Sequence, residues 1–152
     1  GHPEWVDFPR EGNNWSYHYA RRQWHLSEDP HLKYALLGAF DRAMLELVKT
    51  HAFFKDAWAH LVYEHGDDQV LVFSRGGLLF VFGWHPTRSF RDYGFAAAAG
   101  HYRLVLDSDA AVFGGHGRLT PGQEHFSQAA GGLDRLQLYI PSRSAQVLEK
   151  VA

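Results

Sequence analysis

The chain contains 152 residues, a length typical of one domain of roughly 100–150 residues. Hydrophobic residues make up 45% of the sequence, which excludes an intrinsically disordered chain. Lysine and arginine together number 15 and aspartate and glutamate 17, and this near balance argues against a nucleic-acid partner.

The sequence contains no cysteine, which excludes disulfides and thiolate chemistry and fits a cytoplasmic protein. Its longest apolar run is 78–82, far shorter than the roughly 20 residues that cross a bilayer, so we expect no membrane partner. The first residues lack the basic and apolar regions of a signal peptide. Aromatic residues reach 15%, a composition that favours strands and carbohydrate-type surfaces.

The first third of the chain combines an irregular segment with a strong helical pattern. Residues 1–28 show no clean period, which predicts an ordered loop, with a short helix expected within 16–26. Residues 30–49 are predicted to form a helix, with Asp29 as its N-cap and Pro30 in its first turn. The apolar positions of this segment form one stripe of Leu32, Leu36, Phe40, Met44, Leu47 and Val48.

Beyond this helix the apolar period changes to two, which indicates β-strands. Runs at 70–75 and 78–84 flank Gly76-Gly77, a pair that permits the tight turn of a hairpin. Two glycine-rich stretches, 113–117 and 129–132, are predicted to be loops. Further strands are predicted at 59–65, 101–106, 135–140 and 145–150.

We therefore predict a mainly β fold, an antiparallel sandwich or open barrel of about six short strands preceded by a loop and one or two helices. The predicted division of the chain is 1–54 and 55–152. The core of the β part is expected to consist of Val70, Val72, Leu79, Val81, Leu104, Leu106, Leu138 and Ile140.

Candidate chemical motifs are weak when each is taken by its spacing. The eleven histidines include no His-Glu-x-x-His, and His60 and His65 are predicted to point to opposite faces of a strand, so we predict no metal. Asp107 and Asp109 are too close to flank a glycosidic bond and are interpreted as turn formers that bond to their own backbone. No helix pattern follows the glycines of 114–117, and no Gly-x-Ser-x-Gly elbow occurs.

The N-terminal segment is more suggestive because it combines carboxylates with aromatic rings. Glu4, Trp5 and Asp7 are followed by Trp15 and Trp24. Aromatic faces that stack on sugar rings beside carboxylates and arginines are typical of polysaccharide sites. The same composition suits a loop packed on a neighbouring domain, and the spacing leaves both interpretations open.

Three stretches of the sequence resemble one enzyme family. Residues 1–24, beginning Gly-His-Pro-Glu-Trp-Val-Asp-Phe-Pro-Arg, resemble the 1,4-α-glucan (glycogen) branching enzymes of the α-amylase superfamily. Leu-Asp-Ser-Asp-Ala-Ala at 106–111 and Tyr-Ile-Pro-Ser-Arg at 139–143 resemble the C-terminal domain of the same enzymes. The resemblance covers essentially the whole chain in register.

The resemblance implies an architecture for each part of the chain. Residues 1–28 would follow the last strand of a (β/α)₈ barrel on its active-site face, and 30–49 would be the last barrel helix. Residues from about 55 to 152 would form the C-terminal all-β sandwich. The family's three catalytic carboxylates match no position here, so we predict a C-terminal fragment that is inactive alone.

The resemblance also implies the reaction and the partners. These glycosyltransferases of glycogen biosynthesis cut an α-1,4 glucan and transfer the segment to a 6-hydroxyl, through a covalent glycosyl-enzyme and without a cofactor. The partners would be an α-glucan polysaccharide and the missing barrel domain. A stand-alone carbohydrate-binding module and a purely structural β-sandwich module are the alternatives.

Five residues match the loop beside the family's active site and are implied to bind substrate, although packing is the alternative for each of them. They are His2, Glu4, Trp5, Arg10 and Asn13.

The apolar stripe of the predicted helix also needs a covering surface, because most of the barrel sheet is missing from this chain. The stripe can fold onto the β part or pair with that of a second chain. We expect pairing into a homo-oligomer, since the β strands are predicted to fill their own core.

Overall fold

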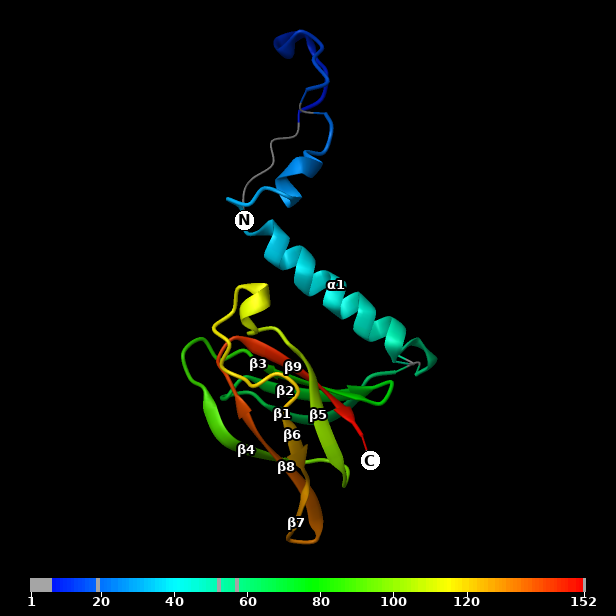
Figure 1. Cartoon of the computed structure of the whole chain (residues 1–152), viewed down its shortest axis with the longest axis vertical. Helices are drawn as coiled ribbons and strands as arrows, with labels where there is room; N and C mark the ends of the chain where they lie inside the picture. Colours follow the sequence, from blue (N-terminus) through cyan, green and yellow to red (C-terminus); the bar gives the residue numbers. More distant parts are fainter. Residues whose placement is uncertain (1–6, 19, 52, 57, 152) are drawn as a thin grey trace.

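The computed structural model describes residues 7–18, 20–51, 53–56 and 58–151 (Figure 1). An irregular N-terminal segment leads into a long helix, α1, which spans Tyr34–Thr50. An antiparallel β-sandwich follows, so the predicted mainly β fold is confirmed.

Two antiparallel sheets form the sandwich, a larger one in the order β1-β2-β3-β9-β5-β6 and a smaller one in the order β4-β8-β7. The larger sheet consists of β1 (His60–His65), β2 (Val70–Arg75), β3 (Leu78–Gly83), β5 (His101–Asp107), β6 (Glu124–Phe126) and β9 (Ser144–Lys150). The smaller sheet consists of β4 (Phe90–Ala96), β7 (Gln128–Ala130) and β8 (Leu133–Ile140). The last strand, β9, lies between β3 and β5 and so joins the two halves of the larger sheet.

The predicted hairpin is confirmed at Gly76 and Gly77, which have φ values of 58° and 78°. These left-handed conformations build the turn that matches the twist of the flanking strands. β2 and β3 then pair in register, with Val72 opposite Val81 and Phe73 opposite Phe80. Because side chains alternate across a strand, the valines face the core and the phenylalanines face outward.

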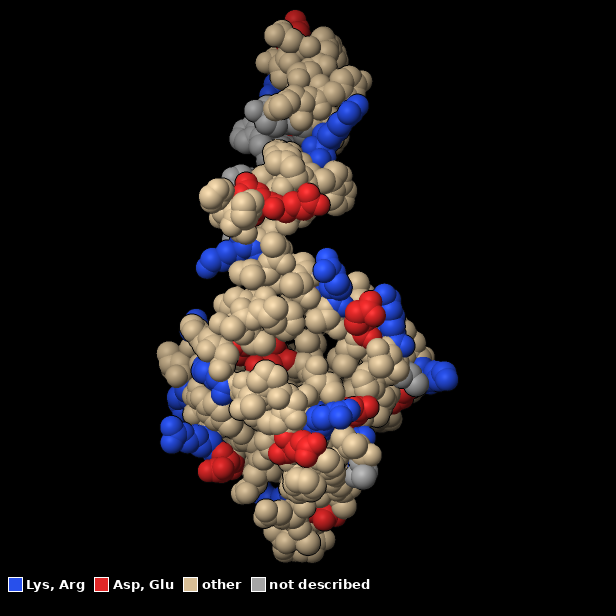
Figure 2. Space-filling model, viewed as in Figure 1, with Lys and Arg blue, Asp and Glu red and all other residues tan. Residues whose placement is uncertain are grey.

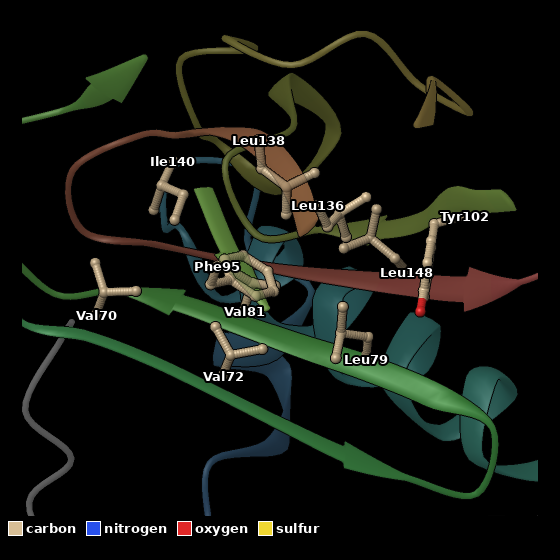
Figure 3. Close-up of a cluster of buried hydrophobic side chains, with 10 residues drawn as sticks. All are labelled: Val70, Val72, Leu79, Val81, Phe95, Tyr102, Leu136, Leu138, Ile140 and Leu148. Carbon is tan, nitrogen blue, oxygen red and sulfur yellow. The ribbon is translucent and has the colours of Figure 1, made fainter. Parts of the chain in front are cut away.

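The hydrophobic core lies between the two sheets (Figure 3). It consists of Val70, Val72, Leu79, Val81, Phe95, Tyr102, Leu136, Leu138, Ile140 and Leu148. All the predicted core residues are buried except Leu106. A bulge between Leu104 and Leu106 in β5 turns Leu106 to the outer face of the sheet, and Asp107 is buried next to it.

The structure contains three strands that the periodicity missed. β4 carries a bulge between Phe90 and Tyr93 and a left-handed Asp92, with φ 51°, so its alternation is broken. β6 and β7 are three residues long, too short to show a period. The predicted loop at 129–132 is therefore wrong in its first half, since β7 extends to Ala130.

Helix α1 begins later than the predicted start at Pro30. Asp29 is not its N-cap, because its carboxylate accepts the backbone N–H of His31 at 2.8 Å and its carbonyl accepts that of Leu32 at 3.1 Å. This separate turn ends before Tyr34 starts the helix. Within the described part of 16–26, the expected short helix is only the beginning of a 3₁₀ turn at Trp24–Ser27.

The N-terminal part and the sandwich differ in burial. No described residue between 7 and 58 is buried, and Figure 1 shows the N-terminal segment projecting beyond the far end of α1, away from the sheets. Among the described residues, no helix combines the length and the apolar character needed to cross a membrane.

Candidate functional site

The predicted substrate-binding residues lie in the N-terminal segment. His2, Glu4 and Trp5 are outside the described residues. Arg10 and Asn13 are described, and they come together in a compact turn around a 3₁₀ helix at Glu11–Asn13. The predicted ordered loop is confirmed for this stretch.

The carboxylate of Asp7 organises this turn. It accepts hydrogen bonds from Arg10 Nε at 3.2 Å and Nη2 at 3.1 Å, and from Asn13 Nδ2 at 3.2 Å. The hydrogen bond from Arg10 is the main reason that the pKa of Asp7 is lowered. Asn13 Oδ1 also accepts the backbone N–H of Arg10 at 2.9 Å. The side chain of Arg10 is thereby held in one orientation while 62% of its surface stays exposed.

A second candidate site is an apolar groove of about 600 Å³ between α1 and the outer face of the larger sheet. The residues that we call the aromatic groove are Phe40, Met44, Leu47, Val48, Phe53, Phe73, Phe80, Phe82, Trp84, Leu106 and Val147. The sheet supplies most of its rings, and the helix supplies the aliphatic stripe predicted from the sequence. The groove is therefore the place where the two parts of the chain face each other.

The rings on the sheet side form a continuous ladder. Phe73 stacks on Phe80 with 4.8 Å between ring centroids and on Phe82 with 5.8 Å. The ring centroids of Phe82 and Trp84 are 5.2 Å apart. Trp84, at the end of the ladder, is 53% exposed. Cross-strand aromatic pairs stabilise a sheet, but their outer surfaces still favour a partner that excludes water.

Helix α1 spans the groove and touches the sandwich at few points. The ring of Phe40 meets the edge of Phe113 at 5.2 Å between centroids. Next to it, a Cβ on Gly114 would lie 2.8 Å from Leu36 Cδ1, so the glycine permits the close approach. No residue of α1 is buried, and Leu37 and Leu45 are exposed. The stripe therefore faces the sandwich and is only partly covered by it.

The loop that meets α1 is held by an ion pair. Arg118 donates to Asp109 from Nε at 2.7 Å and from Nη2 at 3.1 Å, and Nη2 also donates to the carbonyl of Ser142 at 2.9 Å. Burial opposes the ionisation of Asp109, but these bonds and the backbone N–H groups of His116 and Arg118 outweigh it and lower its pKa. The ion pair fixes the loop to the turn between β8 and β9.

Asp107 behaves as predicted and Asp109 does not. Asp107 Oδ1 accepts the backbone N–H of Asp109 at 2.8 Å, as a turn former does. Burial raises the pKa of Asp107, and the nearby charge of Asp109 raises it further. The carboxylate of Asp109 instead binds residues well beyond its own turn, as described above. Both carboxylates are buried and bonded within the fold, which makes them structural.

Metal ligation has no support in the described part of the chain, where no cluster of three or more histidine, aspartate or glutamate residues is close enough to hold an ion. His60 and His65 are exposed and lie beside the carboxylates of Asp56 and Asp68. On the face shown in Figure 2, positive and negative side chains are interspersed over the sandwich.

The sandwich matches a known family. Residues 60–151 match the alpha amylase C-terminal all-beta domain, which is more than half of the chain. The chain belongs to this family. In the matched domain, residues 60–151, the larger sheet has the hydrophobic core on its inner face and the aromatic rings on its outer face.

The similarity extends beyond the residues of the family match to a segment of longer enzymes. The chain is 47% identical to the 1,4-alpha-glucan-branching enzyme of Candida glabrata over 99% of its own length. It is 44% identical to that of Felis catus over 99% of its length and 46% identical to that of Saccharomyces cerevisiae over 97%. The chain spans only 22% of the length of each of these relatives. The resemblance to branching enzymes is therefore confirmed, and it includes the N-terminal part.

The aromatic groove was not predicted from the sequence, although part of its signal is visible there. Phe73, Phe80 and Phe82 alternate with the predicted core valines, which places large apolar residues on both faces of the same hairpin. A strand that is apolar on both faces has two covered surfaces. This pattern predicts a partner for the outer face but does not say which element supplies it.

Proposed function

We propose that this chain is the C-terminal part of a 1,4-α-glucan branching enzyme, in which the sandwich supports the catalytic barrel. The observation that carries the proposal is the 47% identity across 99% of the chain to an enzyme of which it spans 22%. The chain's own role is to bind and support, because no residue matches the family's catalytic carboxylates. Residues 1–54 would belong to the barrel and 55–152 to the sandwich, within a cytoplasmic enzyme.

We propose that the rest of the enzyme docks in the aromatic groove. It presents large apolar side chains from both the helix and the sheet, and few polar groups line it. Isolated proteins rarely leave a contiguous apolar surface of this kind in water. The proposed occupant of the groove is the portion of the longer enzymes that this chain does not match.

In the chain alone, the same face is expected to pair with a second copy. Pairing through α1 and the aromatic groove would cover Met44 and the exposed rings together. Sedimentation equilibrium over a tenfold concentration range distinguishes the states. A constant mass of 17.3 kDa would contradict pairing, whereas a mass that rises with concentration would support it.

The N-terminal segment is the proposed contact to glucan. His2, Glu4, Trp5, Arg10 and Asn13 match the loop beside the family's active site. Asp7 orients the exposed guanidinium of Arg10 beforehand, which lowers the entropic cost of binding a hydroxyl-rich ligand.

A chimeric enzyme tests the proposal. The matching segment of the Candida glabrata branching enzyme is replaced by this chain, and branching is followed by the loss of iodine colour with amylose. We expect the chimera to branch amylose and the isolated chain to leave it unchanged. A folded but inactive chimera, or a loss of colour with the isolated chain, would contradict the proposal.

Two matched variants of the chimera test the role of the aromatic groove. Phe80→Asp places a charge in the groove and is expected to reduce branching strongly, because the charge must be desolvated when the barrel docks. Leu133→Asp changes an exposed residue at the start of β8, outside the groove, and is expected to leave branching unchanged. Equal activities of the two variants would contradict this role.

A further inference from the structure

A polar cleft of about 340 Å³ shares no lining residue with the aromatic groove. Residues of β6 in the larger sheet and of β4, β7 and β8 in the smaller sheet line it, where the chain leaves β6 and continues as β7. The residues that define this polar cleft are Asp92, Glu124, Phe126, Gln128, Arg135 and Gln137. The cleft therefore stays accessible when the aromatic groove is occupied.

Gly94 of β4 lies next to two residues that line the polar cleft, Arg135 and Gln137. A Cβ on Gly94 would lie 3.5 Å from Gln137 Cγ and 3.6 Å from Arg135 Nη2, so the missing side chain leaves room between these two residues. Arg135 Nη2 donates to the carbonyl of Gly94 at 3.0 Å and is held beside the space. Asp92, at the bulge of β4, has the left-handed φ of 51°, a conformation that costs energy for a non-glycine residue.

An aromatic platform stands at one side of the polar cleft. The ring of Phe126 stacks on the imidazole of His101, with 4.4 Å between centroids and 9° between planes. His101 Nε2 in turn lies 3.3 Å from a carboxylate oxygen of Glu124. One face of the phenyl ring is thus supported, while Phe126 remains 62% exposed. A rigid, exposed ring of this kind is suited to stacking on the apolar face of a ligand.

The charges and donors of the polar cleft select the class of ligand. Asp92 and Glu124 outnumber the single positive charge of Arg135, so an anion is disfavoured. Two carboxylates are too few to cage a metal ion, and no larger cluster occurs among the described residues. Carboxylates accept hydroxyl protons, and the amides of Gln128 and Gln137 both donate and accept. A neutral ligand with many hydroxyls and an apolar ring face meets all these groups.

We infer that the polar cleft is a glucan-binding subsite that holds a short stretch of α-1,4-linked chain against Phe126. Its volume lies at the lower end of the roughly 300–1,000 Å³ typical of small-ligand sites. The choice of glucan among hydroxyl-rich ligands rests on the proposed function. A second point of attachment on the same polymer raises the effective concentration of glucan at the enzyme.

Titration of the full chain with maltoheptaose by isothermal calorimetry tests the inference. Phe126→Ala removes the platform, and Gly94→Val places a side chain against Gln137 and Arg135, two residues that line the cleft, in a strand position that accepts a side chain. Each variant is expected to weaken maltoheptaose binding about tenfold. Phe54→Ala removes an exposed phenylalanine outside the cleft and is expected to bind as the wild type does.

Two results would overturn the inference. One is a wild-type chain that does not bind maltoheptaose, and the other is binding that neither Phe126→Ala nor Gly94→Val weakens. The thermal transition of each variant confirms that it is folded. The branching assay on the chimera separates this inference from the proposed function, since a chimera that branches amylose leaves that function standing even when maltoheptaose does not bind in the cleft.

Discussion

The sandwich buries the inner faces of both its sheets, whereas no described residue between 7 and 58 is buried. Helix α1 has a regular apolar stripe like the strands of the sandwich, and it meets the sandwich at Phe40 and Leu36, yet none of its residues is buried. The difference shows that amphipathic periodicity identifies an element but not whether its partner lies in the same chain.

The two parts should therefore differ in what stabilises them. Most of the stability of a helix in a protein comes from packing of its apolar face, and α1 has little of it. The sandwich has a closed core and an ion pair that fixes its longest loop. Changes in the sandwich are expected to alter the free energy of unfolding, and changes in residues 7–58 to alter association and function.

The largest effect is expected for Leu138→Ala. Leu138 is 1% exposed in the centre of the core, so its truncation leaves a cavity and should lower the free energy of unfolding by about 2–5 kcal/mol. Leu45→Ala, on the exposed side of α1, should change it by less than about 0.5 kcal/mol. Urea denaturation of both variants provides the measurement. Similar losses for the two would contradict the difference between the parts.

A smaller effect, with a defined pH dependence, is expected for Asp109→Asn. The variant leaves the donors of Arg118 without a carboxylate and should lower the free energy of unfolding by about 1–3 kcal/mol at pH 7. The folded-state pKa of Asp109 is depressed, so its contribution is present above the unfolded value of about 3.9 and is lost as the pH falls below it. The difference from wild type should therefore shrink below about pH 4.

Asp107→Asn is the matched control for the ion pair. Burial raises the pKa of Asp107, so its ionisation at neutral pH costs stability. The amide oxygen of Asn can still accept the backbone N–H of Asp109, and we expect a variant at least as stable as wild type at pH 7. Equal destabilisation by the two variants would show that the charge of Asp109 has no special role.

Removal of the N-terminal part should lower the free energy of unfolding less than Leu138→Ala does. A shortened chain that begins at Asp56 keeps the carboxylate that accepts the backbone N–H of Gly76 at 3.1 Å and so keeps the support of the hairpin turn. None of the removed residues that the structure describes is buried. We expect a far-UV circular dichroism spectrum of a folded β protein and a cooperative thermal transition. A disordered spectrum would contradict the independence of the sandwich.

The smallest effect on stability is expected for Arg10→Ala. Its ion pair with Asp7 is exposed, and such pairs contribute little to folding. The thermal transition of the chain should not move, whereas the KM of the chimera for amylose should rise because a proposed glucan contact is lost. An unchanged KM would remove Arg10 from the proposed substrate site.

Local pattern predicts much of the sandwich but little of its assembly. The β2–β3 hairpin, β8, β9 and the inner residues follow from alternation and from the glycine pair. β4 does not, because a bulge at Asp92 breaks its period. The insertion of β9 between β3 and β5 also escapes prediction, since alternation identifies strands and not their neighbours.

The candidate sites depend still more on tertiary structure. The pairing of Asp109 with Arg118 joins residues nine positions apart that no periodic pattern relates. The aromatic groove combines a helix with two hairpin strands, and the polar cleft combines strands from both sheets. Arg10 and Asn13 were identified only through the resemblance, because their turn is held by local hydrogen bonds without an apolar period.

Hydrogen–deuterium exchange of the full chain tests the difference between the two parts most directly. Under conditions where sedimentation shows a monomer, amides of β3 and β8 should exchange only through global unfolding, with the free energy given by denaturation. Amides of α1 should exchange through local opening at a much lower free energy, because none of its residues is buried. Protection of α1 equal to that of β8 would contradict the account.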